Sequence, residues 1–336
     1  MEKEHKIDST LGIGPMSSEV IEAVFRYSNY YRKPLMLIAS KNQIDWRGGY
    51  VNGWKTENYK SFIDQMRQQY GLAKVYICRD HCGPGFNGVY DLDDTYKTIE
   101  DDIKNGFDLI HIDFCHFRGS KDEQFEASKK AIEHCLSLKP DIFLEVGTDE
   151  NAGVSYNLSN AEEIEREMDF FKSFCSPDFY VVQTGSLTKE INQVGKFNKQ
   201  FVEKISRICS DKGMSLKEHN GDYLDKDQLA LRKGIVNAIN IAPQLGVVQT
   251  NFVLSRCLMY GIDFGDFIKE AYHGKKWQKW LHGSDDSNKF LCSLISGHYH
   301  FTSDSYKRII EQLGRVEDIR ELIINELMSV IDHYEI

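Results

Sequence analysis

The 336-residue sequence predicts an α/β protein of the (β/α)8 TIM-barrel class with a helical extension at its C-terminus. Eight short apolar segments rich in strand-forming residues recur between residues 11 and 243, and amphipathic segments of helical period separate most of them. Strands that alternate with helices pair in parallel through right-handed crossovers, and eight such units suggest a closed barrel. A doubly wound open sheet is the alternative, disfavoured because no GxGxxG motif follows the first strand.

The predicted strands are short apolar runs that end in polar residues or glycine. In chain order they are LGIG near residue 11, PLMLIA from 34, KVYICRD from 74, DLIHID from 108, DIFLEVG from 141, FYVVQTG from 179, MSLKEH from 214 and AINIAP from 238. The segments between them include SSEVIEAVFRYSNYY, DEQFEASKKAIEHCLSL, NAEEIEREMDFFKSF and NKQFVEKISRICSDKG. Their apolar residues recur at helical spacing, which predicts helices that cover the strands.

The pattern changes after the eighth strand. Residues 262–336 contain helical patterns such as SYKRIIEQL and EDIRELIINELMSVIDHY, and no convincing strand. We therefore predict a barrel over residues 1–261 and a helical extension over residues 262–336. No Pro/Gly linker separates the two parts, so we expect the extension to pack on the barrel.

Charge and hydropathy narrow the classes of partner. The chain has 41 Lys and Arg against 51 Asp and Glu, a net charge of −10, which disfavours nucleic acid and requires a local positive feature for any anionic ligand. The apolar runs are too short to span a bilayer, and the N-terminus MEKEHKIDST is charged where a signal peptide is apolar. We predict a cytoplasmic protein that binds neither membranes nor nucleic acid.

Polar residues follow almost every predicted strand. Because the carboxyl ends of barrel strands open onto one mouth, these residues converge in space. The candidates are Asn42 and Gln43 after the second strand, Arg79, Asp80 and His81 after the third, His111 and Asp113 around the fourth, Glu145 in the fifth, Gln183 after the sixth, His219 and Gly221 after the seventh, and Asn240 in the eighth.

This set of side chains suits metal-assisted proton transfer. His81 and His219 offer imidazole ligands for zinc, with manganese or cobalt as alternatives, and a carboxylate such as Asp80, Asp113 or Glu145 can move a proton. Glycine amides such as that of Gly221 can hold a phosphate. Each residue taken alone has a structural alternative, as a hydrogen-bonded strand-end residue or a helix cap.

At these residues the sequence resembles the larger, so-called non-catalytic subunit of class II D-tagatose-1,6-bisphosphate aldolases. The matching segments, in order, are IASKNQIDWRGGY, RDHCGP, IHID, VGTDE, VVQTG and KEHNGDY, and the similarity runs from about residue 12 to about residue 255. The resemblance implies a (β/α)8 fold and sugar-phosphate chemistry in or beside a class II aldolase. It also implies either a homo-oligomer or a partner aldolase subunit.

The resemblance carries roles to individual residues. The Asp-His pair becomes Asp80, the acid/base carboxylate, and His81, a zinc ligand. His219 resembles the later metal histidine, and Glu145 resembles a strand-end glutamate near the metal. Asn240 resembles an asparagine that contacts the ketose.

Two departures from the family pattern leave the function open. Class II aldolases carry a further zinc histidine after the sixth strand, where this chain reads QTGSL, residues 183–187. Gln183, Glu145 or Asp113 then completes the metal set, or the metal is weak, non-zinc or absent. In the tail, GHYHF places histidines at 298 and 300 where relatives tend to carry arginines.

We therefore expect a metal-dependent enzyme that acts on a sugar phosphate or activated sugar by aldol cleavage or retro-aldol epimerisation. The alternative is a non-catalytic stabilising subunit of a tagatose-bisphosphate aldolase complex.

The run KKWQKW at residues 275–280 is typical of a solvated helix face anchored by two tryptophans, with a phosphate contact as the alternative.

Overall fold

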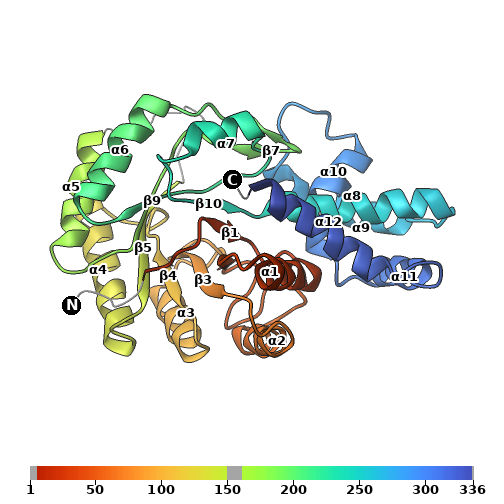
Figure 1. Cartoon of the computed structure of the whole chain (residues 1–336), viewed down its shortest axis with the longest axis horizontal. Coiled ribbons are helices and arrows are strands. Elements are labelled where there is room, and N and C mark those ends of the chain that lie inside the picture. Colours follow the sequence, from red (N-terminus) through yellow and green to blue (C-terminus); the bar gives the residue numbers. More distant parts are fainter. Residues whose placement is uncertain (1–5, 150–160, 335–336) are drawn as a thin grey trace.

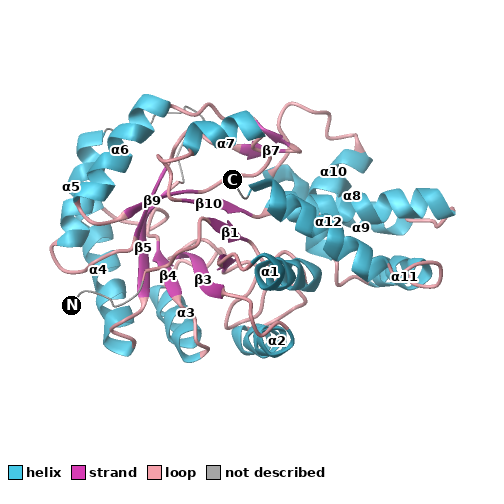
Figure 2. Ribbon diagram, in the orientation of Figure 1, coloured by secondary structure: helices cyan, strands magenta, loops and turns pink. Residues whose placement is uncertain are grey.

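The computed structural model describes residues 6–149 and 161–334. Within them, eight parallel strands close into a barrel in the order β1-β10-β9-β6-β5-β4-β3-β2 (Figures 1 and 2). The strands are β1 Leu11–Ile13, β2 Leu35–Ser40, β3 Val75–Cys82, β4 Leu109–Ile112, β5 Phe143–Thr148, β6 Phe179–Val182, β9 Ser215–Glu218 and β10 Ala238–Ile241. Each corresponds to one predicted strand, and the (β/α)8 fold class is confirmed.

The barrel interior is apolar at one end and polar at the other. Alternate residues of a strand point to opposite faces, so positions two apart share the inside. Met36, Cys78, Leu109, Phe179 and Ala238 form an apolar cluster with Ile38. Two positions further along the same strands the sequence places, among others, Asp80, His111 and Asn240. The strand sequences therefore build an apolar floor below a polar mouth.

Helices surround the strands, and their ends follow the capping rules. They are α1 Ser18–Tyr31, α2 Thr56–Gln69, α3 Leu92–Lys104, α4 Lys121–Leu138, α5 Ala161–Lys172, α6 Lys199–Asp211, α7 Lys226–Arg232 and α8 Pro243–Tyr260. Ser120 and Glu123 form a capping box at the start of α4. Pro243 occupies the first turn of α8, and Gly261 ends that helix at a φ of 67°.

A short hairpin and a helical tail complete the chain. The hairpin pairs β7 Thr188–Lys189 with β8 Asn192–Gln193, and the sequence patterns did not predict it. The tail contains α9 Gly265–His273, η1 Lys276–Lys279, α10 Lys289–Ser296, η2 Gly297–His300, α11 Asp304–Leu313 and α12 Ile319–Tyr334. None of the described helices is both long enough and apolar enough to cross a membrane.

The last helix, α12, packs against α1 of the barrel (Figure 1). Arg26 of α1 donates two hydrogen bonds to Glu321 of α12, at 2.7 and 2.6 Å. The Tyr334 hydroxyl donates to the carbonyl of Gly221, in the loop after β9, at 2.9 Å. These contacts are those expected of an extension that packs on the barrel, and residue 261 stays our proposed boundary.

Candidate metal centre

A bulge in β3 turns two adjacent side chains toward the barrel mouth. Neighbouring residues of a regular strand point to opposite faces, but the pairing of β3 with β4 shifts register between Arg79 and Cys82. Within this bulge, His81 has a φ of 47°, in the left-handed region that a non-glycine residue rarely adopts. Asp80 and His81 can therefore line the same cavity, and strain of this kind concentrates at functional sites.

In each of three histidines, the ring nitrogen that points away from the cluster forms a hydrogen bond. Nδ1 of His81 lies 2.8 Å from Oδ2 of Asp113. Nε2 of His219 lies 3.0 Å from Oε1 of Glu145, and Nε2 of His111 lies 3.0 Å from the carbonyl oxygen of Gly147. Since these partners are acceptors, each outer nitrogen carries the proton and donates it. The inner nitrogens are thereby directed toward a common point, as in metal sites, although Nδ1 of His111 also accepts from the backbone amide of His81 at 3.3 Å.

The inner nitrogens converge with one carboxylate. Ligand atoms of Asp80, His81, His111 and His219 all lie within 4.8 Å of one another. Nδ1 of His219 is 3.3 Å from Nε2 of His81. Two nitrogens bound to one tetrahedral zinc ion at about 2.05 Å lie about 3.3 Å apart. Oδ1 of Asp80 is buried without a hydrogen-bond partner among the described residues, so the donor set fits a divalent cation.

The electrostatics of the site favour a positive charge at this point. Burial alone would lower the pKa of His81, but the charge of Asp80 and the hydrogen bond to Asp113 outweigh it and raise the pKa to about 9. The pKa of His219 is raised for similar reasons, by Asp80 and Asp149 against burial. Against the opposing effect of burial, the charges of His81 and His219 hold the pKa of Asp80 well below its usual range. Without an ion, protons on His81 and His219 supply this positive charge.

Glu145 and Asp113 lie behind the histidines. Glu145 binds His219 through one oxygen, and its other oxygen accepts from Nζ of the buried Lys217 at 2.5 Å. Asp113 binds His81, and it also accepts from the Thr148 hydroxyl at 2.9 Å. Neither acid lines the cavity above the site. Their placement suits orientation of the imidazoles, whereas Asp80 is the predicted acid that does line the cavity.

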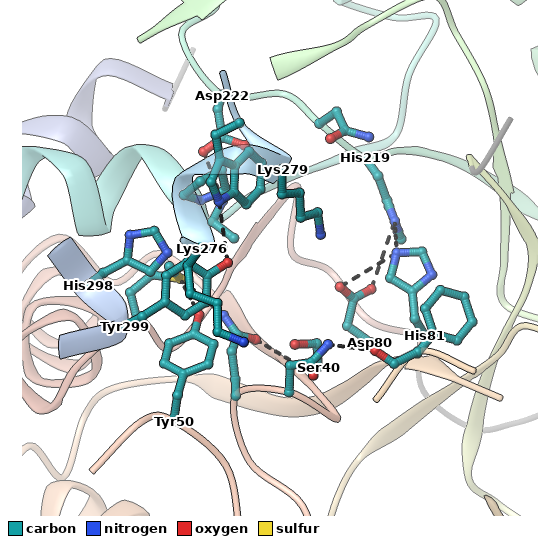
Figure 3. A pocket seen from close by; sticks show the side chains of 18 of the residues that line it. Ser40, Tyr50, Asp80, His81, His219, Asp222, Lys276, Lys279, His298 and Tyr299 are labelled. Carbon is teal, nitrogen blue, oxygen red and sulfur yellow. Dashed lines mark hydrogen bonds and ion pairs between the residues drawn. The ribbon is translucent and has the colours of Figure 1, made fainter. Parts of the chain in front are cut away.

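The centre opens into a cavity of about 890 Å3 between the barrel mouth and the tail (Figure 3). Three of the predicted substrate-binding residues line it: Asn42, Gln43 and Asn240. Both amide atoms of Asn240 are buried and lack a hydrogen-bond partner among the described residues. Asn240 can therefore take a hydroxyl or carbonyl of a ligand without giving up an internal bond.

Three predicted substrate-binding residues do not reach this cavity. Arg79 is fully buried, and its guanidinium binds Asp102 and the carbonyls of Ala39 and Ile44. Gln183 donates to the carbonyl of Asp149 and accepts from the amide of Gly185. These bonds use the polar groups that a ligand would need. Both side chains therefore hold loops in place and are not free to bind a ligand.

The third residue, Gly221, serves close packing. Its amide donates to the carbonyl of Asn240 at 3.0 Å, so it is not available for a phosphate. A Cβ atom at this position would lie 2.2 Å from Cγ2 of Ile239, which explains the glycine.

Other residues of the site had no predicted role. His111 was a candidate at a strand end without a metal role, and it belongs to the cluster although it does not line the cavity. Asp149 lies at the same centre, with Oδ1 3.4 Å from Nδ1 of His219 and no hydrogen-bond partner for that atom among the described residues. Glu150, the last residue of the VGTDE segment, lies outside the described residues. The tail adds Lys276, Lys279, His298, Tyr299 and His300.

Solved structures share the fold at low sequence identity. A probable tagatose 6 phosphate kinase from Sinorhizobium meliloti 1021 matches with a TM-score of 0.81 and 15% identity over 97% of this chain and 99% of that chain. The YdjI aldolase from Escherichia coli K12 gives a TM-score of 0.57 at 12% identity, and the fructose-bisphosphate aldolase from Campylobacter jejuni gives 0.57 at 13%. Each of these two aldolase matches covers 91% of this chain and 90% of the aldolase chain.

The family comparison concerns the part of the chain that carries the Asp-His pair and β4. It confirms the resemblance stated from the sequence, since residues 1–135 match the family described as D-tagatose-1,6-bisphosphate aldolase subunit GatZ/KbaZ-like.

Proposed function

We propose that this protein is a divalent-metal-dependent carbohydrate enzyme of class II aldolase type, acting on a sugar phosphate or activated sugar. The observation that carries the proposal is the convergence of three inner imidazole nitrogens and Asp80 on one point, while acceptors behind them engage the outer nitrogens. His81, His111, His219 and Asp80 would hold the ion, which supplies Lewis acidity to a ketose oxygen. Zinc is the proposed metal, with manganese or cobalt as alternatives.

The residues around the cavity can perform the proton transfers of an aldol reaction. In cleavage, a carboxylate removes the proton of a hydroxyl, the adjacent carbon–carbon bond breaks, and its electron pair forms an enediolate. Asp80 or Asp149 is the candidate acceptor, because both line the cavity and each has a buried oxygen without a hydrogen-bond partner among the described residues. Asn240 would orient the ketose through its free amide group.

Cleavage and epimerisation share these steps. If the enediolate adds back to the opposite face of the aldehyde fragment, the same bond reforms and one hydroxyl-bearing carbon is inverted. The same acid then returns the proton to the new alkoxide. Neither outcome needs a further co-reactant, so both belong to the proposed activity.

The second candidate is a non-catalytic subunit that stabilises a partner aldolase. It is favoured by Gln183, which stands where class II aldolases are expected to carry a histidine, and by the similarity of residues 1–135 to a family of aldolase subunits. The presence of His111 in the cluster weakens this candidate, because it supplies a third imidazole from β4 instead.

Metal analysis and product analysis together test the proposal. We expect one zinc, manganese or cobalt ion per chain that is lost in His81→Ala and retained in His134→Ala, a partly exposed histidine outside the cavity. The metal-loaded protein is then incubated with ketose phosphates and nucleotide sugars in deuterated water and followed by NMR. Triose signals indicate cleavage, and a changed stereocentre without label indicates re-addition.

Asp80→Asn should abolish both signals while Asp141→Asn, on the surface, keeps them. Metal-free protein that converts nothing but raises the activity of a partner aldolase would overturn the enzyme assignment and support the subunit.

A further inference from the structure

The tail forms a second polar wall of the cavity, opposite the histidine cluster. Figure 3 shows Lys276, Lys279, His298 and Tyr299 across the cavity from Asp80 and His81. The lysines come from η1 and the other two from η2, so this wall belongs entirely to the C-terminal extension. A ligand that reaches from the barrel mouth into this space contacts both walls.

His298 is a buried polar group without a partner. It is 1% exposed and lines the cavity, and neither ring nitrogen has a hydrogen-bond partner among the described residues. Gly246 of α8 makes room for it, because a Cβ atom there would lie 2.7 Å from Cβ of His298. Buried polar groups in folded proteins are nearly always hydrogen-bonded, so this ring is available to a ligand.

Lys276 and Lys279 supply unpaired positive charge beside it. Within residues 6–149 and 161–334, neither ammonium forms an ion pair with a carboxylate. Their Nζ atoms lie 5.9 Å from the ring centroid of Tyr299 and 4.9 Å from that of Trp280. In a chain of net charge −10, two free lysines on one cavity wall form the local positive feature that an anionic ligand requires.

The backbone of η1 is fixed from behind. Trp277, between the two lysines, is buried and stacks on Tyr272 with ring centroids 5.6 Å apart. The carbonyl of Lys279 accepts from Nζ of Lys189 at 2.8 Å. Trp277 thus anchors this segment, and the lysines on either side of it line the cavity.

The position that holds phosphate in many barrels is occupied by the protein itself. That position is formed by the loops after the last two barrel strands and a helix N-terminus. Here Oδ1 of Asp222 accepts from the amides of Ala242 and Gln244, at 3.0 and 2.8 Å, at the start of α8. Because these amides already donate to Asp222, they are not free for a second anion, and an anionic ligand needs another site.

We propose that Lys276, Lys279 and His298 form an oxyanion site for the end of the substrate remote from the metal centre. The substrate class is an extended sugar derivative that bears a phosphate or carboxylate at that end. The lysines bind the charge, and the neutral imidazole of His298 adds one directional hydrogen bond. This inference rests on the proposed function, because it places the reacting carbons at the histidine cluster.

The test measures binding of unreactive acyclic probes to chelator-treated, metal-free protein by calorimetry. The probes are sorbitol, sorbitol 1-phosphate and gluconate, which differ only in the group at carbon 1. We expect one anionic probe or both to bind at least about tenfold more tightly than sorbitol, a typical effect of charge-assisted hydrogen bonds. The tighter of the two anions identifies phosphate or carboxylate as the natural group.

Variants separate this site from general electrostatics. In Lys276→Met/Lys279→Met the preference over sorbitol should disappear, and in His298→Phe it should weaken. Lys307→Met, an exposed lysine of α11 outside the cavity, should keep it. Equal binding of all three probes, or an unchanged preference in the double variant, would overturn the proposal.

Metal binding is measured on the same samples. If the double variant loses the anion preference but the wild-type protein binds no metal, the oxyanion site stands and the proposed enzyme fails. If the wild-type protein binds metal normally but shows no anion preference, the oxyanion site fails and the proposed enzyme stands. The lysines are exposed, so the double variant should fold, which circular dichroism verifies.

Discussion

Nε2 of His81 and Nδ1 of His219 lie 3.3 Å apart, although 138 residues separate them in the chain. The first comes from a bulge in β3 and the second from the end of β9, on different sides of the barrel. The two nitrogens meet because their rings are held from behind by Asp113 and Glu145. The distance is thus set by two acids that do not line the cavity themselves.

His111 should be as necessary for metal binding as His81. It supplies the third imidazole of the cluster, so we expect His111→Ala to lower zinc affinity by more than the roughly 100-fold that marks the loss of a supporting contact. Metal content after dialysis and competition with a chromophoric chelator measure this. His116→Asn, which lines the cavity outside the cluster, is the control. Retention of full affinity in His111→Ala would remove β4 from the site.

Glu145→Gln and Asp113→Asn should weaken metal binding by about 10- to 100-fold without abolishing it. Each change keeps the shape of the side chain, but the new amide can present its NH2 group to the histidine and so favour the wrong tautomer. The same chelator competition gives the affinities. Affinities lost as fully as in His81→Ala would instead show that these acids are themselves ligands.

Zinc affinity should rise with pH between about 6 and 9. In the metal-free protein the neighbouring acids raise the pKa of His81 to about 9, so near neutral pH an incoming ion must displace its proton. Lower pH therefore weakens binding, and affinity levels off once His81 is neutral. Calorimetry in buffers of different ionisation enthalpy counts the protons released. Zinc binding without proton release at pH 7 would contradict this electrostatic account.

All eight barrel strands could be predicted because each is a short apolar run bounded by polar residues. The candidate metal centre could be predicted in part, since Asp80 and His81 lie at the end of β3 and His219 directly follows β9. His111 carried a usable signal: it lies two positions after Leu109, so strand alternation places both on the inside of the barrel. The register pairs His111 with Glu145 across β4 and β5, which sequence spacing alone does not reveal.

The predicted substrate residues that do not line the cavity share a physical explanation. Arg79 and Gln183 are polar residues at or near strand ends, as predicted, but their partners are backbone carbonyls and amides from loops whose paths the sequence does not specify. The tail residues were noted in the runs KKWQKW and GHYHF, but the sequence could not place them beside the strand ends. Lys276 and His298 line the cavity because the helices after residue 261 fold back over the barrel mouth. Sequence patterns do not reveal that path.

Arg79→Met should destabilise the fold by about 3–5 kcal/mol. Nε and Nη2 of Arg79 each bind a different oxygen of Asp102 at 2.6 Å, and removal of the guanidinium leaves a buried carboxylate unpaired. Urea denaturation measures the free energy of unfolding. Arg315→Ala, which breaks an exposed pair with Glu311, should change it by less than about 0.5 kcal/mol. Unchanged stability with weakened ligand binding would return Arg79 to a substrate role.

His298 should make the protein sensitive to acid. Burial, reinforced by the positive charges of His300 and Lys279, lowers the pKa of His298 from 6.5 to about 3. Above pH 6.5 the ring is neutral in both states, so it has no pH effect there. As pH falls from 6.5 toward 3, only the unfolded chain takes up the proton, and stability drops by up to about 1.4 kcal/mol per pH unit.

His298→Asn should therefore lose less stability than the wild-type protein between pH 7 and pH 4.5. Thermal or urea unfolding across this range gives the two curves, which should converge as the pH falls. Ile295→Val, buried in the same extension, removes a methyl group but no titratable group, so its curve should stay parallel to that of the wild type. If the His298→Asn curve also stays parallel, the ring accepts its proton in the folded protein and is not held neutral at the cavity wall.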